Sequence, residues 1–429
     1  MTPLPRALFI CLLGACALPD TDPAGSVATL VPERIDSAGV TILTHSAGAF
    51  ERAPRVVLDS TPLAVIAGSA DDIEADISTI RPVLFLGDGR LVGIDQQRQV
   101  VVVFGPDGET RQEFGRQGAG PGEYGRLNNI VPGNGDTLLV ADYMNNRVGL
   151  LDPDRGPLGE FPLSAPRTAG GNSPIGMIGD RILLTGVNYS SGSEEPPGIK
   201  GILFDPASDV ARRTFTTGPE ERPAEAPRQF TTSSGAVLVA VRAISIPALA
   251  VFPRAFAWNG ETVIADGNRF RLEWWDTAGT TRQQLRVDRQ RMPVTSAVWE
   301  AYVSDMIAQS MGSGSVAAGG TVFFGSGGET PDTALMRKHL AEEPHADSLP
   351  LFERTQLGPN GTLWVVDYPV PGSSAWAATA FAADGRLLGR VSGDSGAAPL
   401  VFGDDRAVFR SEDDLGIATF TIRKLIFPK

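Results

Sequence analysis

The sequence is poor in cysteine and histidine. Its two cysteines are Cys11 and Cys16, and its three histidines are His45, His339 and His345. Both cysteines fall in an N-terminal segment that we expect to be processed or lipidated. The folded part is therefore predicted to have no disulfide and no catalytic thiol. So few histidines and cysteines also argue against a zinc site and against a Ser-His-Asp triad.

Long apolar runs and an excess of positive charge are missing as well. No stretch approaches the roughly 18 consecutive apolar residues that read as a transmembrane helix. The formal net charge is −13. We therefore expect no nucleic-acid partner, because proteins that bind nucleic acid present a basic surface to the phosphates. Electrostatic attachment to anionic lipid is not expected either.

The N-terminus reads as an export signal. Arg6 precedes a short apolar segment, which ends in Leu13-Gly14-Ala15-Cys16. This ending resembles the lipobox of bacterial lipoproteins, in which cleavage before the cysteine leaves its thiol to carry a diacylglyceryl group. The resemblance implies a signal peptide over 1–15, lipidation of Cys16 and an exported, membrane-anchored protein. Ala17 after the cysteine favours the outer membrane or a periplasm-facing position. A plain secretory signal cut elsewhere is the alternative.

Residues 16–38 carry Pro, Asp, Gly and Ser without periodicity, and they are predicted to form a flexible tether. Beyond them, six segments repeat one pattern of apolar strand, tight turn and apolar strand. These segments are 87–108, 114–156, 179–206, 260–279, 361–385 and 403–427. Asp95 and Asp142 are in register, 47 residues apart. A period in the forties predicts an all-β, six-bladed β-propeller of four-stranded antiparallel blades over 39–429.

Two segments outside the repeat carry further expectations. Residues 40–44 (VTILT) form a lone strand, which we expect to pair into the last blade and close the ring. Residues 293–311 place apolar side chains at helical spacing, which predicts one short helical insert within about 293–349. That helix either packs on the rim of the propeller or serves as a lid or docking helix. The acidic run 71–76 is either a solvated loop or a cation site.

Three motifs carry a resemblance to a known family. They are FGRQGAGPGEY (114–124), LLVADYMNNRV (138–148) and SEDDLGIATFTIRKL (411–425). Together they resemble the NHL-like six-bladed propellers, and in particular bacterial lipoprotein propellers. Such propellers serve mainly as binding scaffolds, and relatives with similar blades include lactonases and amidating lyases. The resemblance implies the fold and does not choose an activity.

Four aspartates occupy equivalent positions. Each ends the second strand of its blade, so that ring symmetry places them on one face together with the loop 118–123; they are Asp95, Asp142, Asp266 and Asp367. They either accept backbone N–H bonds in their own turns or line a mouth that binds Ca²⁺ or sugar hydroxyls. Other candidate ligand-binding residues near this mouth are Asn188, three tyrosines with stacking surface (Tyr143, Tyr189 and Tyr368) and three arginines that would suit an anion (Arg81, Arg126 and Arg254).

Two functions fit these observations. The first is a lipid-anchored, extracytoplasmic scaffold that binds a protein, glycan or small molecule on this loop face, without catalysis or a required cofactor. The alternative is a divalent-metal-dependent hydrolase or lyase, lactonase-like, in which carboxylates such as Asp142 or Asp266 hold the cation that activates water. The lack of an evident nucleophile or histidine cluster favours the scaffold.

Overall fold

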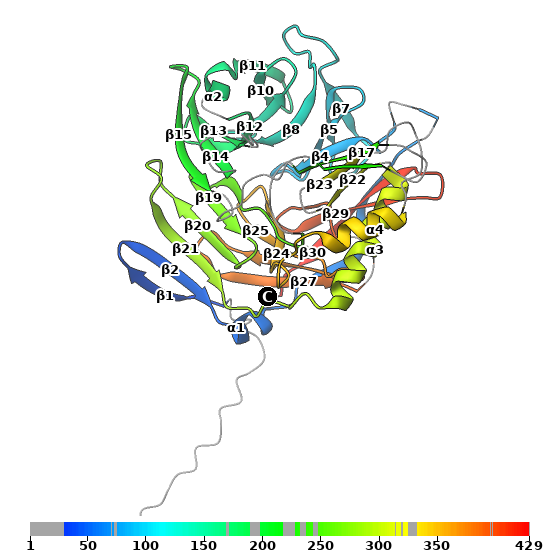
Figure 1. The fold of residues 1–429 in the computed structure, drawn as a ribbon. Coiled ribbons are helices and arrows are strands. Elements are labelled where there is room, and N and C mark those ends of the chain that lie inside the picture. Colours follow the sequence, from blue (N-terminus) through cyan, green and yellow to red (C-terminus); the bar gives the residue numbers. More distant parts are fainter. Residues whose placement is uncertain are drawn as a thin grey trace, which may run out of the picture.

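Six sheets, each with four antiparallel blade strands, form the ring that the repeat predicts, and one of these sheets carries two further strands (Figure 1). The structure is a computed structural model. It describes residues 30–69, 71–72, 75–168, 171–188, 198–217, 228–231, 237–242, 248–313, 315–318, 321–324, 333–394, 396 and 398–428.

Blades are numbered along the chain, and the strands within each blade are given from the innermost to the outermost. Blade 1 contains β4 (Ile80–Phe85), β5 (Leu91–Asp95), β6 (Val100–Phe104) and β7 (Arg111–Phe114). Blade 2 contains β8 (Leu127–Pro132), β9 (Leu138–Asp142), β10 (Arg147–Asp152) and β11 (Gly156–Pro162). Blade 3 contains β12 (Ser173–Ile178), β13 (Arg181–Asn188), β14 (Gly198–Asp205) and β15 (Val210–Thr217). The short helix α2 (Ser164–Thr168) lies between blades 2 and 3 in the chain.

The second half of the ring follows the same plan. Blade 4 contains β18 (Arg254–Trp258), β19 (Glu261–Asp266), β20 (Arg271–Trp275) and β21 (Thr281–Val287). Blade 5 contains β24 (Phe352–Leu357), β25 (Leu363–Asp367), β26 (Trp376–Phe381) and β27 (Leu387–Gly393). Blade 6 contains β28 (Val401–Phe402), β29 (Arg406–Glu412), β30 (Ala418–Ile426) and, from the N-terminal region, β3 (Val57–Ala67).

The middle strands show why this sequence forms blades. β5 (LVGID), β6 (VVVVF) and β9 (LLVAD) are buried along their whole length. A strand covered on both faces has no solvent side, so its sequence is a continuous apolar run and not an alternation. The outer strand β21 (TRQQLRV) has only two buried residues, Leu285 and Val287, and is otherwise polar. The apolar runs that recur in the sequence are therefore the centres of the blades.

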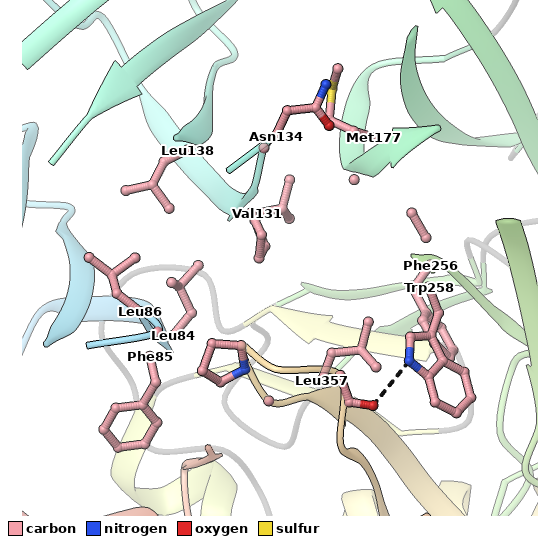
Figure 2. Close-up of a pocket in the computed structure, with 18 of the residues that line it drawn as sticks. Leu84, Phe85, Leu86, Val131, Asn134, Leu138, Met177, Phe256, Trp258 and Leu357 are labelled. Carbon is pink, nitrogen blue, oxygen red and sulfur yellow. Dashed lines mark hydrogen bonds between the residues drawn. The ribbon is translucent and has the colours of Figure 1, made fainter. Parts of the chain in front are cut away.

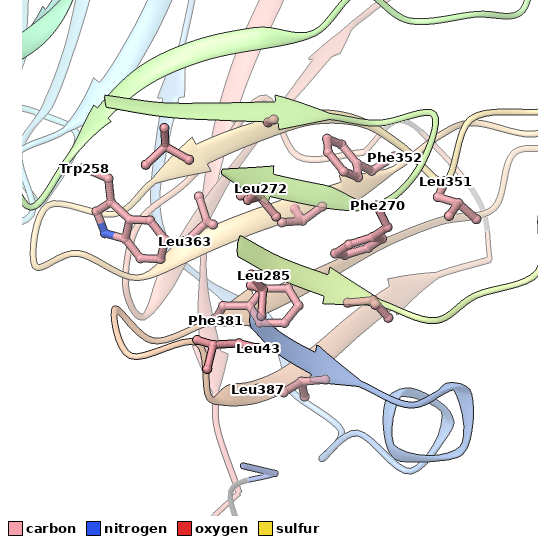
Figure 3. Packing of buried hydrophobic residues seen from close by; sticks show 14 of the residues in the cluster. Leu43, Trp258, Phe270, Leu272, Leu285, Leu351, Phe352, Leu363, Phe381 and Leu387 are labelled. Carbon is pink, nitrogen blue, oxygen red and sulfur yellow. The ribbon is translucent and has the colours of Figure 1, made fainter. Parts of the chain in front are cut away.

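The hydrophobic core lies between the blades. Each of the six junctions has its own cluster of buried apolar residues: blades 1 and 2, 2 and 3, 3 and 4, 4 and 5, 5 and 6, and 6 and 1. Figure 3 shows the cluster between blades 4 and 5, where Trp258, Phe270 and Leu285 of blade 4 face Phe352 and Phe381 of blade 5. The sixth junction, between blades 6 and 1, shows that the ring is closed.

Closure by an N-terminal strand is confirmed, but the strand is not the one expected. β3 pairs antiparallel with β30 and completes blade 6. The expected strand at residues 40–44 instead belongs to β2 (Val40–His45), which pairs in parallel with β21 of blade 4. In the order of the chain, the outer strand of each blade precedes the inner strand of the next blade. The outer strand of blade 6 must therefore be the segment just before β4, which is β3.

The predicted tether also contains structure. β1 (Glu33–Ser37) forms a hairpin with β2, so blade 4 has six strands. Ala38 and Gly39 at its tip have φ of 50° and 82°, and two positive φ angles are typical of the type I′ turn of a tight hairpin. The signal peptide and Cys16 lie outside the described residues. Among the described residues, no helix is long and apolar enough to cross a membrane.

The predicted helical insert is confirmed as α3 (Ser296–Ser313), followed by an unpredicted helix α4 (Thr333–Glu342). Val303 and Met306 of α3 pack on Leu340 of α4. The Asp305 carboxylate accepts a hydrogen bond from Gly372 N in blade 5, at 2.9 Å. A seventh sheet lies outside the ring beside α3 (Figure 1). Its strands, in spatial order, are β16 (Arg228–Thr231), β17 (Val237–Arg242), β23 (Thr321–Phe324) and β22 (Ser315–Ala318).

Candidate functional site

The six inner strands surround the central channel and give it two different ends. They are β4, β8, β12, β18, β24 and β28. All of them begin at one face, which we call the connection face, because the connections from the preceding outer strands arrive there. All of them end at the opposite face, which we call the turn face, because short turns lead from there into the second strands. The two long connections that hold α3, α4 and the seventh sheet both leave from the connection face.

The four predicted aspartates lie at the connection face, each as the last residue of β5, β9, β19 or β25. Asp95 and Asp142 are each only 1% exposed. The Asp95 carboxylate accepts hydrogen bonds from Gln97 N, Arg98 N and the Thr79 hydroxyl, all at 3.0 Å. This is the Asx-turn arrangement, in which the carboxylate satisfies the backbone of its own turn.

Asp142 ties two motifs of the sequence together. Its carboxylate accepts from Gly125 N, Arg126 N and the side-chain amide of Asn145, and Asn145 also donates to Gly118 O at 2.9 Å. Burial alone would raise the pKa of Asp142. The backbone donors of Arg126 and Gly125 and the Asn145 amide outweigh it, so the pKa is lowered. The negative charge of Asp142 is therefore stabilised by hydrogen bonds within the fold.

The glycine-rich loop before blade 2 is built around Tyr124, which is 3% exposed. A Cβ on Gly115 would lie 2.3 Å from a carbon of the Tyr124 ring, and the φ of Gly115 is 92°, so only glycine fits there. The Glu123 carboxylate accepts from Ala119 N and Gly120 N. The motif that carried the family resemblance is thus a packed loop, held by its own hydrogen bonds.

The other two aspartates are less buried. Asp266 accepts from Asn268 N at 3.0 Å, and its carboxylate lies 3.8 Å from Arg271. Asp367 pairs with Arg289 at 3.2 Å and also with Arg390. Both of these guanidinium groups lie 4.7 Å from the centroid of the Phe50 ring, in α1 (Ala47–Glu51). This cluster fixes the N-terminal segment across blades 4 and 5.

The predicted calcium mouth is not assembled by these carboxylates. Each comes from a different blade, and within the part of the chain that the structure describes no three His, Cys, Asp or Glu side chains gather as a metal site would need. In the acidic run, Asp76 accepts from Ser78 N within its own turn, and Ile73 and Glu74 lie outside the described residues.

The remaining predicted residues are spread over the connection face. Tyr143 is 44% exposed, and the Arg167 guanidinium lies 5.6 Å from its ring centroid. Tyr368 is half-buried, and burial raises its pKa, with the neighbouring Tyr302 of α3 and Glu353 adding to the shift. Asn188 ends β13, but its side chain is not described, and Tyr189 lies outside the described residues.

Arg81, Arg126 and Arg254 are exposed, and each lies on an inner strand or directly before one. Sequence reasoning missed two further arginines beside them, Arg354 in β24 and Arg410 in β29. Neither is part of a repeated motif, so no pattern drew attention to them.

A hollow lies at the other end of the channel, on the turn face. It is a cavity of about 810 Å³, lined by residues of all six inner strands and of the turns that follow five of them. Figure 2 shows Leu84, Val131, Met177, Phe256 and Leu357 pointing into one space from five blades. Among the lining residues, Asp136 alone has an ionisable side chain.

Polar groups of the cavity wall are mostly engaged with the protein. Trp258 Nε1 donates to Gly361 O at 3.2 Å, and the Asn134 amide donates to Gly179 O at 3.0 Å. The Gln356 amide donates to Leu400 O at 2.9 Å and accepts from Phe402 N at 3.0 Å. The surface left for a ligand is therefore uncharged apart from Asp136, with polar and apolar parts of similar extent. Sequence reasoning missed this site, and the recurring turns GDG, GNGD and NG were the only available signal.

Comparisons with known proteins do not assign this chain to a family. No family model and no curated protein matches the chain. Solved structures with a similar fold include a member of the DUF4221 family from Bacteroides vulgatus, at 10% identity and a TM-score of 0.48, covering 88% of this chain and 100% of that one.

Two further similar structures are proteins with named activities. One is the calcium-binding protein regucalcin from Agrobacterium tumefaciens, at 10% identity and a TM-score of 0.33, covering 90% of this chain and 98% of that one. The other is virginiamycin B lyase from Staphylococcus aureus, at 11% identity and a TM-score of 0.35, covering 87% of this chain and 100% of that one. No ligand, metal or activity is carried over from them to this chain.

Proposed function

We propose that the protein is a non-catalytic binding propeller that takes a small molecule with an uncharged, apolar body into the turn-face cavity. The observation that carries this proposal is the cavity itself, about 810 Å³ in volume and lined by apolar side chains from all six blades. Small-molecule sites are typically clefts of about 300–1,000 Å³ with mostly apolar walls. Burying apolar surface contributes roughly 25 cal/mol per Å², so the apolar side chains of the lining favour a ligand that has an apolar body.

The absence of catalysis in this proposal rests on the chemistry of the lining. Asp136 is the one ionisable lining residue, and it is exposed. Acid–base catalysis needs a positioned titratable group with a shifted pKa near the reacting atoms. On the connection face, the four repeated aspartates are committed to turns and ion pairs, which removes support from a metal-dependent hydrolase that would use them.

The proposal includes a location outside the cytoplasm, with a lipid on Cys16 as the anchor, and this part rests on the lipobox alone. The variant Cys16→Ser tests it. In a bacterial host, the parent chain should sediment with membranes and incorporate labelled fatty acid, and the variant should do neither. Equal partition of both chains would remove the anchor.

The cavity is tested with a neutral fluorescent probe, N-phenyl-1-naphthylamine. Val131→Trp places a large ring in the cavity, and we expect it to weaken probe binding about tenfold, the loss of roughly 1.4 kcal/mol of binding free energy. Val65→Trp is the matched control, because Val65 lies on β3 and is 51% exposed. The control should bind like the parent. Melting temperatures of all three show whether each variant is folded.

Probe binding that is unchanged in Val131→Trp, or equally lost in Val65→Trp, would contradict the proposal. A chelator-sensitive hydrolysis of lactones or esters by the parent chain would support the metal-dependent alternative instead. If neutral glycans bind in preference to the apolar probe, the ligand class would be glycans. The cavity would then remain the binding site only if Val131→Trp abolished glycan binding.

A further inference from the structure

Four arginines follow one another around the connection face. They are Arg254, Arg354, Arg410 and Arg81, which we call the arginine arc. They belong to blades 4, 5, 6 and 1, and these blades are consecutive in the closed ring. They lie at the opposite end of the channel from the apolar cavity, so an inference from them is independent of the proposed function.

Register places the arc at the level of the four aspartates. Ile80, next to Arg81, pairs with Asp95, and Phe352, two residues before Arg354, pairs with Asp367. The pairing shifts at both places, between Ile80 and Val83 and between Phe352 and Arg354. Such β-bulges redirect side chains and are common next to binding sites.

The arc is linked across its blades by short contacts. Arg354 Nη2 donates to Pro399 O at 2.6 Å, in the segment that enters blade 6. Arg410 Nη2 donates to Ser78 O at 3.3 Å, just before β4 of blade 1. Arg354 and Arg254 are close enough for their charges to interact: burial lowers the pKa of Arg354, the charge of Glu353 opposes this, and the charge of Arg254 adds to the lowering. The guanidinium groups therefore lie around one mouth.

The arc has more positive charge than the described residues around it neutralise. Arg410 pairs with Glu412, and Glu353 lies near Arg354. Arg81 and Arg254 form no ion pair with a described residue. The aspartates at the same level do not compensate, because their oxygens are committed elsewhere.

Two guanidinium groups also carry a buried donor without a partner. Arg354 Nε and Arg410 Nε are inaccessible to solvent and make no hydrogen bond among the described residues. An unsatisfied buried donor costs about 1–3 kcal/mol, and more when it is charged. A fold that leaves two such donors in one row of arginines gains free energy when an acceptor with negative charge is present.

We propose that the arginine arc binds an oxyanionic group, either a phosphoryl group or a carboxylate, at the connection-face end of the channel. Guanidinium groups present paired N–H donors that match the oxygens of both groups. Arg354 and Arg410 supply the partly buried donors, and Arg81 and Arg254 supply the exposed charges that attract the anion. The site lies in a protein of net charge −13, so attraction is local and not a property of the whole surface.

The test is calorimetric titration of the purified chain with inorganic phosphate and, separately, with glucuronate at constant ionic strength. We expect saturable binding of at least one, weakened about tenfold in Arg354→Gln and in Arg410→Gln, because a hydrogen bond to a charged group contributes about 1.5–3 kcal/mol. Arg155→Gln is the matched control. Its side chain is 81% exposed and follows β10 on the turn face, and binding should be unchanged.

Phosphate and glucuronate arms distinguish the two oxyanions, since a phosphoryl site should prefer the dianion. If neither anion binds, or if Arg155→Gln weakens binding as much as the arc variants do, the proposal is overturned. If Arg354→Gln or Arg410→Gln fails to fold, the double variant Arg81→Gln with Arg254→Gln takes their place, because both side chains are exposed. Unchanged binding in that double variant would also overturn the proposal.

Discussion

The two ends of one channel have opposite chemistry. At the turn face, apolar side chains from six inner strands surround a cavity whose polar groups bond to the protein. At the connection face, aspartates end the second strands and arginines lie on the inner strands and on β29, and two arginines keep a buried donor without a partner among the described residues. Both ends are built from the same repeated blade, so the difference does not come from the fold plan.

The difference comes from the segments that reach each end. Similar short turns, rich in Gly, Asn and Asp, lead out of the inner strands at the turn face, and their similarity gives this end of the channel a uniform rim. The connections at the opposite face vary from the tight loop before blade 2 to the long insert with α3 and α4. Variation in charge and length is thus concentrated on one face, where loops carry function without disturbing the core.

The largest expected effect is loss of stability in Asp142→Ala. Removing this buried carboxylate leaves the Gly125 and Arg126 amides and Asn145 without their acceptor. We expect the free energy of unfolding to fall by about 3 kcal/mol. Urea denaturation measures it, and Asp266→Ala, at a half-buried turn, should cost less than about 1 kcal/mol. Full stability of Asp142→Ala would make the aspartates candidate ligand-binding groups again.

The next largest effect is expected from variants that affect one end of the channel and not the other. Val131→Trp should weaken binding of the neutral probe about tenfold and change phosphate binding by less than about twofold. Arg354→Gln should weaken phosphate binding and leave probe binding nearly unchanged. The reason is that the two residues lie at opposite ends of the inner strands. Titration of each ligand into both variants checks this. A parallel loss of both ligands in one variant would mean that the ends form a single site.

A smaller effect is expected from pH. His45 is buried, its Nε2 lies 2.8 Å from Gly385 O, and burial lowers its pKa. The unfolded chain then binds a proton more readily than the folded one, so stability is present above about pH 6.5 and falls as the pH drops towards the folded pKa. Melting temperature should decrease between pH 7 and pH 5 by less in His45→Gln than in the parent. The arginines and the glucuronate carboxylate both stay charged throughout, so glucuronate binding should not follow this change.

The smallest effect is predicted for Arg81→Gln. Its side chain is exposed, so its charge acts through water and contributes little, about two- to threefold in phosphate affinity. Raising the salt concentration should erase this difference while the effect of Arg354→Gln persists. An equal salt dependence of the two variants would contradict the division into buried donors and exposed charges.

The ring was predictable because its signal is repeated. Middle strands such as β6 read as continuous apolar runs, and the second strands end in aspartate at equivalent positions. The closing strand was assigned wrongly because residues 40–44 and Val57–Ala67 both read as strands. Which of them pairs with β30 is a long-range choice that local pattern does not contain. β1 was missed because ERIDS is exposed throughout and owes its shape to its partner β2.

The candidate sites were less predictable than the ring. The aspartates were found because they repeat, and repetition is also why they serve the turns. The cavity has no motif, since it arises where five distant turns and six inner strands meet. Arg354 and Arg410 matter because one nitrogen of each has no partner among the described residues, and that is a property of three-dimensional packing.

The N-terminal segment has a consequence for the order of folding. It pairs β2 with blade 4, exchanges hydrogen bonds with Arg390 of blade 5 on the way, and ends as β3 in blade 6. β3 is therefore synthesised long before β30, the strand with which it pairs. Pairing between distant parts of a chain is slow, and a ring that lacks β30 would leave the edge of β3 open to other chains. We expect a chain that ends after blade 5 to aggregate, because β3 then lacks its partner β30.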